Sequence, residues 1–315
     1  NVAIGYESLL TQQTTGNGSA QLTFNTAVGD STGKAITSGK HNTIVGGLAG
    51  DALTSGESNV AIGYLALSSE DTGHRSVAIG SFALFSQNND SNNDNTAVGY
   101  NAGFALTSGV QNTIVGGLAG DALTTGSLNT AMGYEALSSE DTGGRNTAMG
   151  WRALKALDYA GSAYNTAFGF SAGEAISTGI HNTIVGGLAG DALTSGQSNT
   201  VVGYSALSAE TTGSQNTAIG IEALKVSDGG SNNVAVGRSS GLAVSTGDNN
   251  TLIGTNAGDS ITSGSGNIVI GQGAAASAVD VSNEITLGNS SISAIRAQVT
   301  SISSLSDRRD KKDIK

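Results

Sequence analysis

Apolar and polar positions follow one short motif along nearly the whole chain. The motif is Asn-Thr-Ala-Val-Gly in its most regular form, at Asn25 to Gly29, and it occurs in close variants sixteen times. Successive copies are separated by a dominant step of 17, with 24 once and 19 twice. A fixed short period is typical of a solenoid, in which each unit contacts its neighbours and stacking supplies the core. The copies start at Asn1, Asn25, Asn42, Asn59, Ser76, Asn95, Asn112, Asn129, Asn146, Asn165, Asn182, Asn199, Asn216, Asn233, Asn250 and Asn267.

A longer repeat contains the short one. Asn25, Asn95 and Asn165 are equally spaced, each four coils after the one before, so four coils form one block. The segments 42–56, 112–126 and 182–196 are nearly identical. Duplication of a four-coil block explains both periods.

The positions within one coil predict its local structure. With the repeat Asn as offset zero, offset three is always large and apolar, offset four is always Gly, and offset seven is always small. A β-branched residue followed by Gly predicts a short strand that ends at a tight corner. We expect a return strand from offset seven and a second corner near offsets 13 and 14, where Thr-Gly or Ser-Gly recurs. Each coil would then be a flattened β-roll of two strands.

Both faces of the strand are apolar. Because neighbouring strand residues point to opposite faces, offsets two and three cannot share one core. One face must fill the coil, and the other needs a second surface, most simply another copy of the chain. The pattern predicts an all-β roll of about sixteen coils over residues 1–276, on the order of 75 Å long at ~4.8 Å per strand.

Composition limits the classes of function. Aromatic residues are only 4% and charged residues 12% of the chain, with 47 Gly and neither Pro nor Cys. We therefore expect close stacking of small residues, without disulfides, cofactors or a Cys-based metal site. The net charge of −11 argues against nucleic-acid binding, and the absence of a long apolar run argues against membrane insertion. Since Asn1 lies inside a repeat, we expect the chain to belong to a longer protein.

Few residues suggest chemistry. An Asp at offset nine could bind Ca²⁺, but it more often caps its own turn. The three His residues lie in coils far apart and are expected at exposed corners. We expect the repeat Asn residues to form a hydrogen-bonded ladder, and we expect no catalysis by the shaft. The Asp residues concerned are Asp51, Asp121, Asp191 and Asp259.

Surface aromatic residues are the candidates for receptor binding. Tyr, Trp or Phe often occupies offset five, where it could line a sugar-binding groove or simply cover the corner. Insertions at the corners of a solenoid commonly form binding faces. The insertion Lys155 to Tyr164 contains Tyr159 and Tyr164, and with Trp151 these form the predicted receptor-binding set.

The repeat resembles the head of trimeric autotransporter adhesins of the YadA type. Val2 to Gly5, Val60 to Gly63 and Val77 to Gly80 match the Val-Ala-Ile-Gly of that family directly. The resemblance implies a left-handed parallel β-roll that associates side by side as a homotrimer. The coils here are longer than the adhesin unit, so the outer corner should be longer.

The C-terminal segment from Glu284 is similar to the end of bacteriophage tail-fibre shafts, where an endosialidase-type intramolecular chaperone begins. Its apolar residues lack the repeat motif, so we expect an interwound trimeric β segment at 277–305 and the chaperone start at 306–315. In that family a Ser, aided by a Lys, cleaves the peptide bond before it. The matching residues here are Ser306 and Lys311. A solvated basic tail is the alternative interpretation.

These observations favour the structural shaft of a homotrimeric phage tail fibre that attaches to the host surface. The expected partners are two further copies of the chain, a host glycan or surface protein, and other virion tail proteins. A bacterial adhesin head at the cell surface is the second hypothesis. A polysaccharide depolymerase is the third, and it would require clustered carboxylates in a groove.

Overall fold

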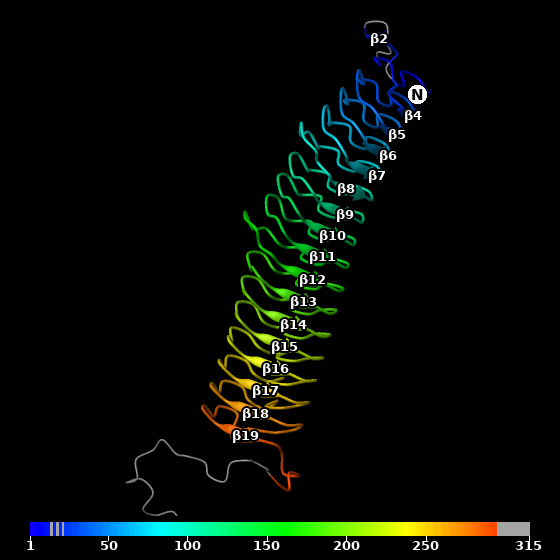
Figure 1. The fold of residues 1–315 in the computed structure, drawn as a ribbon. Helices are drawn as coiled ribbons and strands as arrows, with labels where there is room; N and C mark the ends of the chain where they lie inside the picture. Colours follow the sequence, from blue (N-terminus) through cyan, green and yellow to red (C-terminus); the bar gives the residue numbers. More distant parts are fainter. Residues whose placement is uncertain (13–14, 17–18, 21, 295–315) are drawn as a thin grey trace, which may run out of the picture.

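The computed structural model describes residues 1–12, 15–16, 19–20 and 22–294. They form one elongated stack of coils, with the first coil at one end and β19 at the other (Figure 1). One sheet of 17 strands runs along the stack, and each strand pairs in parallel with the strand of the next coil. No helix occurs among these residues, so none could cross a membrane as a helix. The predicted all-β parallel solenoid is confirmed.

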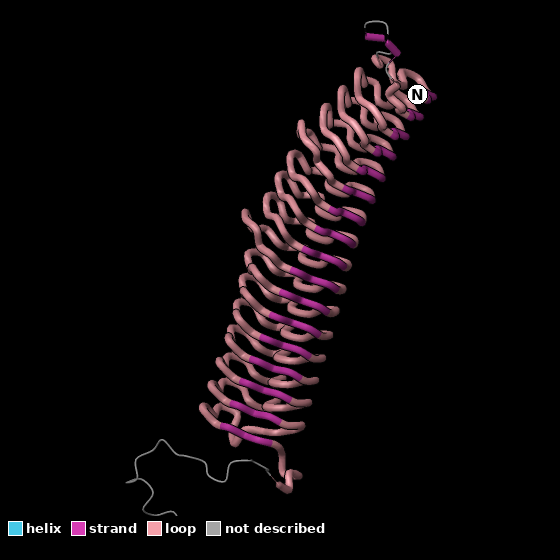
Figure 2. Tube along the Cα trace, in the orientation of Figure 1, coloured by secondary structure: helices cyan, strands magenta, loops and turns pink. Residues whose placement is uncertain are grey.

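Every strand of this sheet is three residues long and occupies offsets one to three. The strands lie on one side of the stack, and loops complete each coil (Figure 2). A separate antiparallel pair, β2 (Thr15–Gly16) and β3 (Ser19–Ala20), lies in the long first coil, between Asn1 and Asn25. The strands of the main sheet are β1 (Val2–Ile4), β4 (Thr26–Val28), β5 (Thr43–Val45), β6 (Val60–Ile62), β7 (Val77–Ile79), β8 (Thr96–Val98), β9 (Thr113–Val115), β10 (Thr130–Met132), β11 (Thr147–Met149), β12 (Thr166–Phe168), β13 (Thr183–Val185), β14 (Thr200–Val202), β15 (Thr217–Ile219), β16 (Val234–Val236), β17 (Thr251–Ile253), β18 (Ile268–Ile270) and β19 (Ile285–Leu287).

The predicted return strand is wrong for the described residues. Offsets six, eight and 16 adopt left-handed backbone conformations instead, as at Leu65, Leu67 and Ser58 with φ of 55°, 53° and 61°. These conformations turn the N–H groups of offsets six and eight toward the preceding and the following coil, respectively. The Leu65 N–H donates to the preceding coil at Gly47, and the Leu67 N–H donates to the following coil at Ala83. The turns are therefore hydrogen-bonded along the stack without forming a strand.

The coil interior is filled by complementary side chains at offsets two, eight and 11. At Gly50, which is at offset eight, the space is occupied by Ile44 from offset two and Leu53 from offset 11. At Leu67, which is also at offset eight, offset two of the same coil is the small Ala61. At Gly33, offset two is Ala27, and Ile44 and Leu9 from the neighbouring coils fill the space together with Ile36. The apolar side chains at these offsets belong to one continuous buried cluster from Leu9 to Ala274. Alternating large and small residues thus keeps a narrow core close-packed.

The repeat Asn forms the expected ladder, but mainly with the backbone. Asn25 Oδ1 accepts the backbone N–H of Asn42 at 2.9 Å, and Asn42 Nδ2 donates to the Gly56 carbonyl of its own coil at 2.9 Å. The amide therefore joins successive coils and also ties the start of the strand to the second corner of its own coil. Ser76 lacks this amide, and Gln87 compensates by donating to Ser76 Oγ and accepting from Asn95 Nδ2.

The predicted end of the roll at residue 276 is wrong. Ile285–Leu287 is β19, which pairs in register with β18. Glu284 takes the place of the repeat Asn, and its N–H donates to Asn267 Oδ1 at 3.0 Å. Residues 277–283 thus complete the coil that begins at Asn267, and Glu284 begins a further coil of the same roll rather than a separate segment. The rest of the predicted interwound segment, 295–305, lies outside the described residues.

Candidate functional site

The outward face of the sheet carries an unbroken row of large apolar side chains. Offset two points into the coil, so offset three points away from it. The described side chains of this row are only half-buried or exposed, from Ile4 at one end to Leu287 at the other. Offset one, which shares this face, is Thr, Val or Ile. A single chain therefore presents one long apolar surface to solvent.

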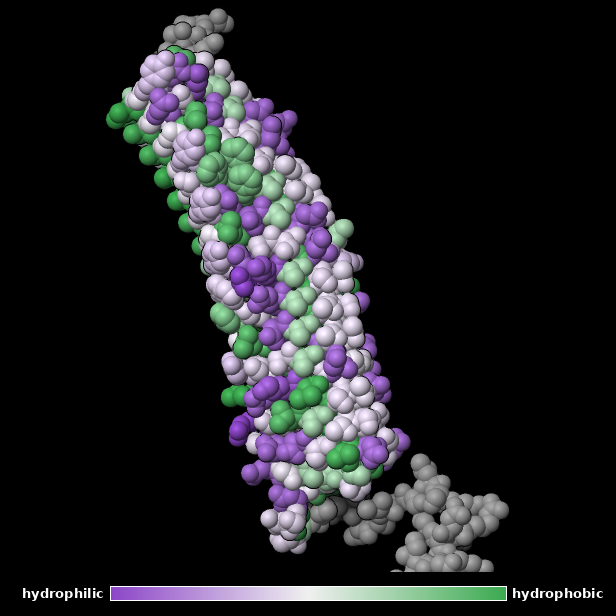
Figure 3. All heavy atoms as spheres, turned by 180° about the vertical axis from the view of Figure 1, so that it is seen from behind, coloured by the Kyte–Doolittle hydropathy of each residue, from purple (hydrophilic) through white to green (hydrophobic). Residues whose placement is uncertain are grey.

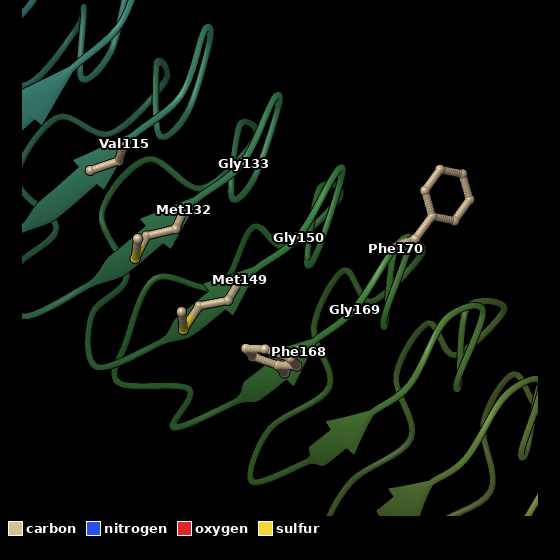
Figure 4. Close-up of a pocket in the computed structure, with 8 residues that line it drawn as sticks. All are labelled: Val115, Met132, Gly133, Met149, Gly150, Phe168, Gly169 and Phe170. Atoms are coloured by element: carbon tan, nitrogen blue, oxygen red, sulfur yellow. The ribbon is translucent and has the colours of Figure 1, made fainter.

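A shallow groove of about 460 Å³ lies on this face. Its floor is formed by Val115, Met132, Met149 and Phe168 from four successive strands, with the corner glycines beside them (Figure 4). No charged group lines it. The two Met side chains are flexible and polarisable, and such residues adapt to a facing apolar surface. The groove is therefore suited to apolar packing rather than to acid–base chemistry.

Trp151 lies past the corner that follows β11 and is already engaged by its neighbours. The Phe170 ring is parallel to the indole, with centroids 4.7 Å apart, and the Arg152 guanidinium lies 4.1 Å from the indole centroid. Arg152 also pairs with Glu135 at 2.9 Å and Glu174 at 3.6 Å. This network holds the half-buried indole in place.

Tyr164 lies at the other edge of the sheet, where the strands begin, two residues before β12. Its exposed ring stacks on His181 with centroids 5.8 Å apart, and the Arg145 guanidinium lies 5.6 Å from its centroid. Tyr159, in the same insertion, packs partly against the core. The predicted receptor-binding set is therefore not one site: Trp151 follows a strand, whereas Tyr164 precedes one.

An aromatic cluster that the sequence analysis did not single out covers part of the first four-coil block. Phe82 contacts Tyr64, Phe85, Tyr100 and Phe104 with centroids 5.5 to 6.3 Å apart. The clue in the sequence was that aromatic residues occupy offsets five, six and nine in three consecutive coils. One block further along, where the second block meets the third, the same offsets carry Tyr134, Arg152, Lys155, Phe170 and Glu174. Seen from the side opposite to Figure 1, the surface mixes hydrophilic and hydrophobic residues (Figure 3).

Three fully buried glutamates, Glu70, Glu140 and Glu210, occupy offset 11 in equivalent coils and were also missed. Each carboxylate accepts the N–H of the corner Gly three positions later, as between Gly143 and Glu140 at 2.7 Å. Burial raises the pKa of the Glu70 and Glu140 carboxyls, and the hydrogen bonds from the corner N–H groups oppose this. These glutamates close the second corner from inside.

The offset-nine aspartates do not gather further ligands. Burial raises the pKa of the Asp51, Asp121 and Asp191 carboxyls, while backbone N–H groups of their own turns lower it. Within the described ranges, only Glu140, Asp141 and Asp158 bring three potential metal ligands within 4.8 Å of one another. Both Glu140 oxygens there already accept backbone N–H groups, from Gly143 and Tyr159. The geometry favours the interpretation of the offset-nine aspartates as turn residues.

The histidines lie at corners, as expected. His41 stacks on Phe24, His181 stacks on Tyr164, and His74 Nδ1 accepts the Glu57 N–H at 2.9 Å. They occupy separate coils. Ser306 and Lys311, the predicted self-cleavage residues, lie outside the described residues, so that prediction stands as it was made.

Comparison with protein-family models and with curated proteins finds no match for this chain.

The arrangement can therefore offer three kinds of surface. The outward sheet face is apolar and continuous, the first corner carries aromatic and ionic clusters, and the second corner is widened where a coil is longer than the dominant step. Nothing in the apolar groove could transfer a proton or bind a metal ion. The surfaces are suited to association and recognition.

Proposed function

We propose that this chain is the structural shaft of a homotrimeric bacteriophage tail fibre that takes part in attachment to the host surface. The observation that carries the proposal is the apolar row along the outward face of all 17 strands. Monomeric proteins rarely expose a continuous apolar surface of this extent. Such a surface requires a partner with the same length and the same spacing.

A second copy of the same chain meets both requirements. Copies that lie side by side and point in the same direction have identical axial spacing, so their apolar rows coincide along the whole stack. Closed rotational symmetry would bury every row without leaving one exposed. The resemblance to YadA-type heads suggests three copies and a left-handed roll, and we adopt both as parts of the proposal.

The stacked coils are also suited to a shaft. Each coil is hydrogen-bonded to its neighbours through the strand, the turns and the repeat Asn, so length is added one coil at a time without a change of architecture. The similarity of the segment from Glu284 to tail-fibre ends supports a phage origin. The Val-Ala-Ile-Gly match supports the alternative, a bacterial adhesin head. A depolymerase has less support, since the groove on the sheet has no carboxylate.

The assembly is tested by the mass of the purified full-length protein in solution, measured by light scattering. We expect the mass of three chains. A monomer at micromolar concentration would contradict the proposal. The phage and adhesin hypotheses are separated by immunogold electron microscopy with antibody to this chain: label on virion tails supports the fibre, and label on uninfected bacteria supports the adhesin.

A further inference from the structure

The second corner is widened twice, at equivalent places in the first and second blocks. Each widening follows from a lengthened coil, and the inserted segment is tied back to the preceding coil by a bridge, His74 to Asn92 in one and Gly144 to Ser162 in the other. Beside each bridge lies a polar notch, of about 210 Å³ in the first block and about 260 Å³ in the second. We name them notch 1 and notch 2. They are duplicates that lie one block apart.

Both notches keep an arginine at the same offset, Arg75 in notch 1 and Arg145 in notch 2. In notch 1 the arginine faces Asp94 at 3.9 Å, and Glu57 also lines the space. Tyr164 and Ser127 take the places of these two acids in notch 2. The place of His74 is taken by Gly144, which has no side chain. Notch 2 has therefore lost its acids, retained its cation and gained space.

The groups around Arg145 define what notch 2 could bind. Arg145 Nη1 donates to Ser162 Oγ at 2.6 Å, which fixes the side chain beside the exposed Tyr164 ring. Across the described part of the chain, no carboxylate pairs with Arg145, although six other Lys or Arg residues form such pairs. The rest of the notch is lined by the hydroxyl residues Thr125, Ser127 and Thr142, by the apolar Leu128 and by two glycines.

We propose that notch 2 is a binding site for an acidic saccharide, with the sugar carboxylate on the Arg145 guanidinium and the sugar hydroxyls against those of Thr125, Ser127 and Thr142. Arginine presents a planar fork of donors that matches a carboxylate. The Tyr164 ring lies against the guanidinium and helps to hold it, and the hydroxyl lining of the notch is complementary to sugar hydroxyls. The inference deepens the proposed function, since it names the class of surface glycan that a host-attachment shaft would contact.

The chain itself supplies suitable substitutions. Gln111 and Gln215 occupy the offset of Arg145 with the same left-handed backbone, at φ of 59° and 61°. Asn232 and Asn249, like Tyr164, directly precede a repeat Asn and have a left-handed backbone. Arg145→Gln and Tyr164→Asn therefore place residues that the fold already accepts. Arg75→Gln is the matched control in notch 1. Thermal unfolding of each variant verifies that the roll is intact.

Binding is measured by calorimetry on the full chain with trigalacturonic acid, and with maltotriose as the neutral saccharide. We expect saturable binding of the acidic trisaccharide only, weakened about tenfold or more by Arg145→Gln, since a hydrogen bond to a charged group is lost. Tyr164→Asn should also weaken binding, and Arg75→Gln should leave it unchanged.

Three results would overturn the inference: no binding of trigalacturonic acid, equal loss in Arg75→Gln and Arg145→Gln, or full competition by equimolar inorganic phosphate, which would show a general anion site. These results are independent of the trimer mass and of the immunogold label. A failure of notch 2 is therefore distinguishable from a failure of the fibre proposal.

Discussion

The corner glycine at offset four is the residue on which each coil depends most. At Gly46 the backbone φ is +128°, and a Cβ would lie 2.6 Å from the Gly63 carbonyl oxygen of the next coil. Neither the conformation nor the space admits a side chain. The adjacent Gly47 has an ordinary backbone, and a Cβ there would meet nothing closer than Tyr64 at 3.7 Å.

We therefore expect Gly46→Ala to destabilise its coil by roughly 2–4 kcal/mol, because backbone must move to relieve the overlap. Gly47→Ala, the neighbouring control, should change stability little. Since a solenoid opens locally, the measurement is amide hydrogen exchange of the coils around Gly46. Equal protection in the two variants would show that the corner tolerates a side chain.

The buried glutamates predict a dependence of stability on pH. Burial raises the pKa of Glu140 above the ordinary value of 4.5. The folded state therefore holds this proton more tightly than the unfolded state, so its stabilising contribution is complete below 4.5 and is lost as pH rises through the higher folded value. Gln87 occupies the same offset in another coil, which makes Glu140→Gln compatible with the fold.

We expect Glu140→Gln to remove the loss of stability at higher pH. The protection of backbone amides near β10 and β11 should then vary less above pH 4.5 than in the wild type. Glu135→Gln is a control of opposite sign. The hydrogen bond from Lys155 lowers the pKa of Glu135, so the contribution of Glu135 to stability is present above 4.5 and is lost as pH falls. An unchanged profile in Glu140→Gln would contradict the assignment.

At the scale of the element, strand β10 separates folding from association. Ala131 is fully buried inside the coil, whereas its neighbour Met132 lies on the outward row and lines the apolar groove. Ala131→Glu should unfold its coil, because a charge would be buried without a partner. Met132→Lys should leave the coil folded but weaken association of the copies.

Circular dichroism and light scattering on the two variants distinguish these effects. We expect lost β signal for Ala131→Glu, and a retained β signal with reduced mass for Met132→Lys. Should Met132→Lys assemble like the wild type, the outward row would not be the interface. The sequence could predict that the two faces differ in role, but not which one faced inward.

Packing inside one coil can be tested as a cycle. Ile44→Ala should cost about 2–5 kcal/mol through a cavity. Gly50→Leu should also destabilise, because a Cβ would lie 2.9 Å from Leu53 and 3.3 Å from Ile44, although Leu67 shows that leucine accepts this backbone. The double variant copies the arrangement of Ala148, Leu154 and Leu157 in another coil.

We therefore expect the double variant to be more stable than the sum of the single changes by at least about 1 kcal/mol. Hydrogen exchange measures this coupling for the coils around β5. Additive effects would show that offsets two and eight do not share one space. The Leu and Gly alternation at offset eight was visible in the sequence, and it was the available clue to the left-handed turn that replaces the return strand.

At the scale of the whole molecule, the sequence predicted the solenoid, its direction of pairing and its corners, because each depends on a residue type that recurs at a fixed offset. It missed the left-handed leucines, since leucine by itself does not signal a positive φ. It also missed the coil containing β19, because Glu284 replaced the repeat Asn, although the step of 17 and Gly288 were retained. Trp151 and Tyr164 were grouped from residue type alone, which cannot show that one follows β11 and the other precedes β12.

Self-cleavage remains a prediction about the full-length protein. If Ser306 acts as a nucleophile with Lys311 as its base, Ser306→Ala and Lys311→Ala should each leave a band larger than the wild type on a denaturing gel. Lys312→Ala is the adjacent control and should be processed normally. Identical bands for all four proteins would mean that this chain keeps its C-terminal domain.

Glu284 also determines how the ladder ends. An Asn in its place would offer Oδ1 to the N–H of a further coil, and an open row of unpaired strand groups is a template for aggregation. Glu284 instead directs its carboxylate back to Ser277 of the preceding coil and to Thr286 of its own. The final rung therefore offers no side-chain acceptor to an incoming strand. Growth of one rod onto another, end to end into a fibril, is disfavoured by a single substitution in the repeat.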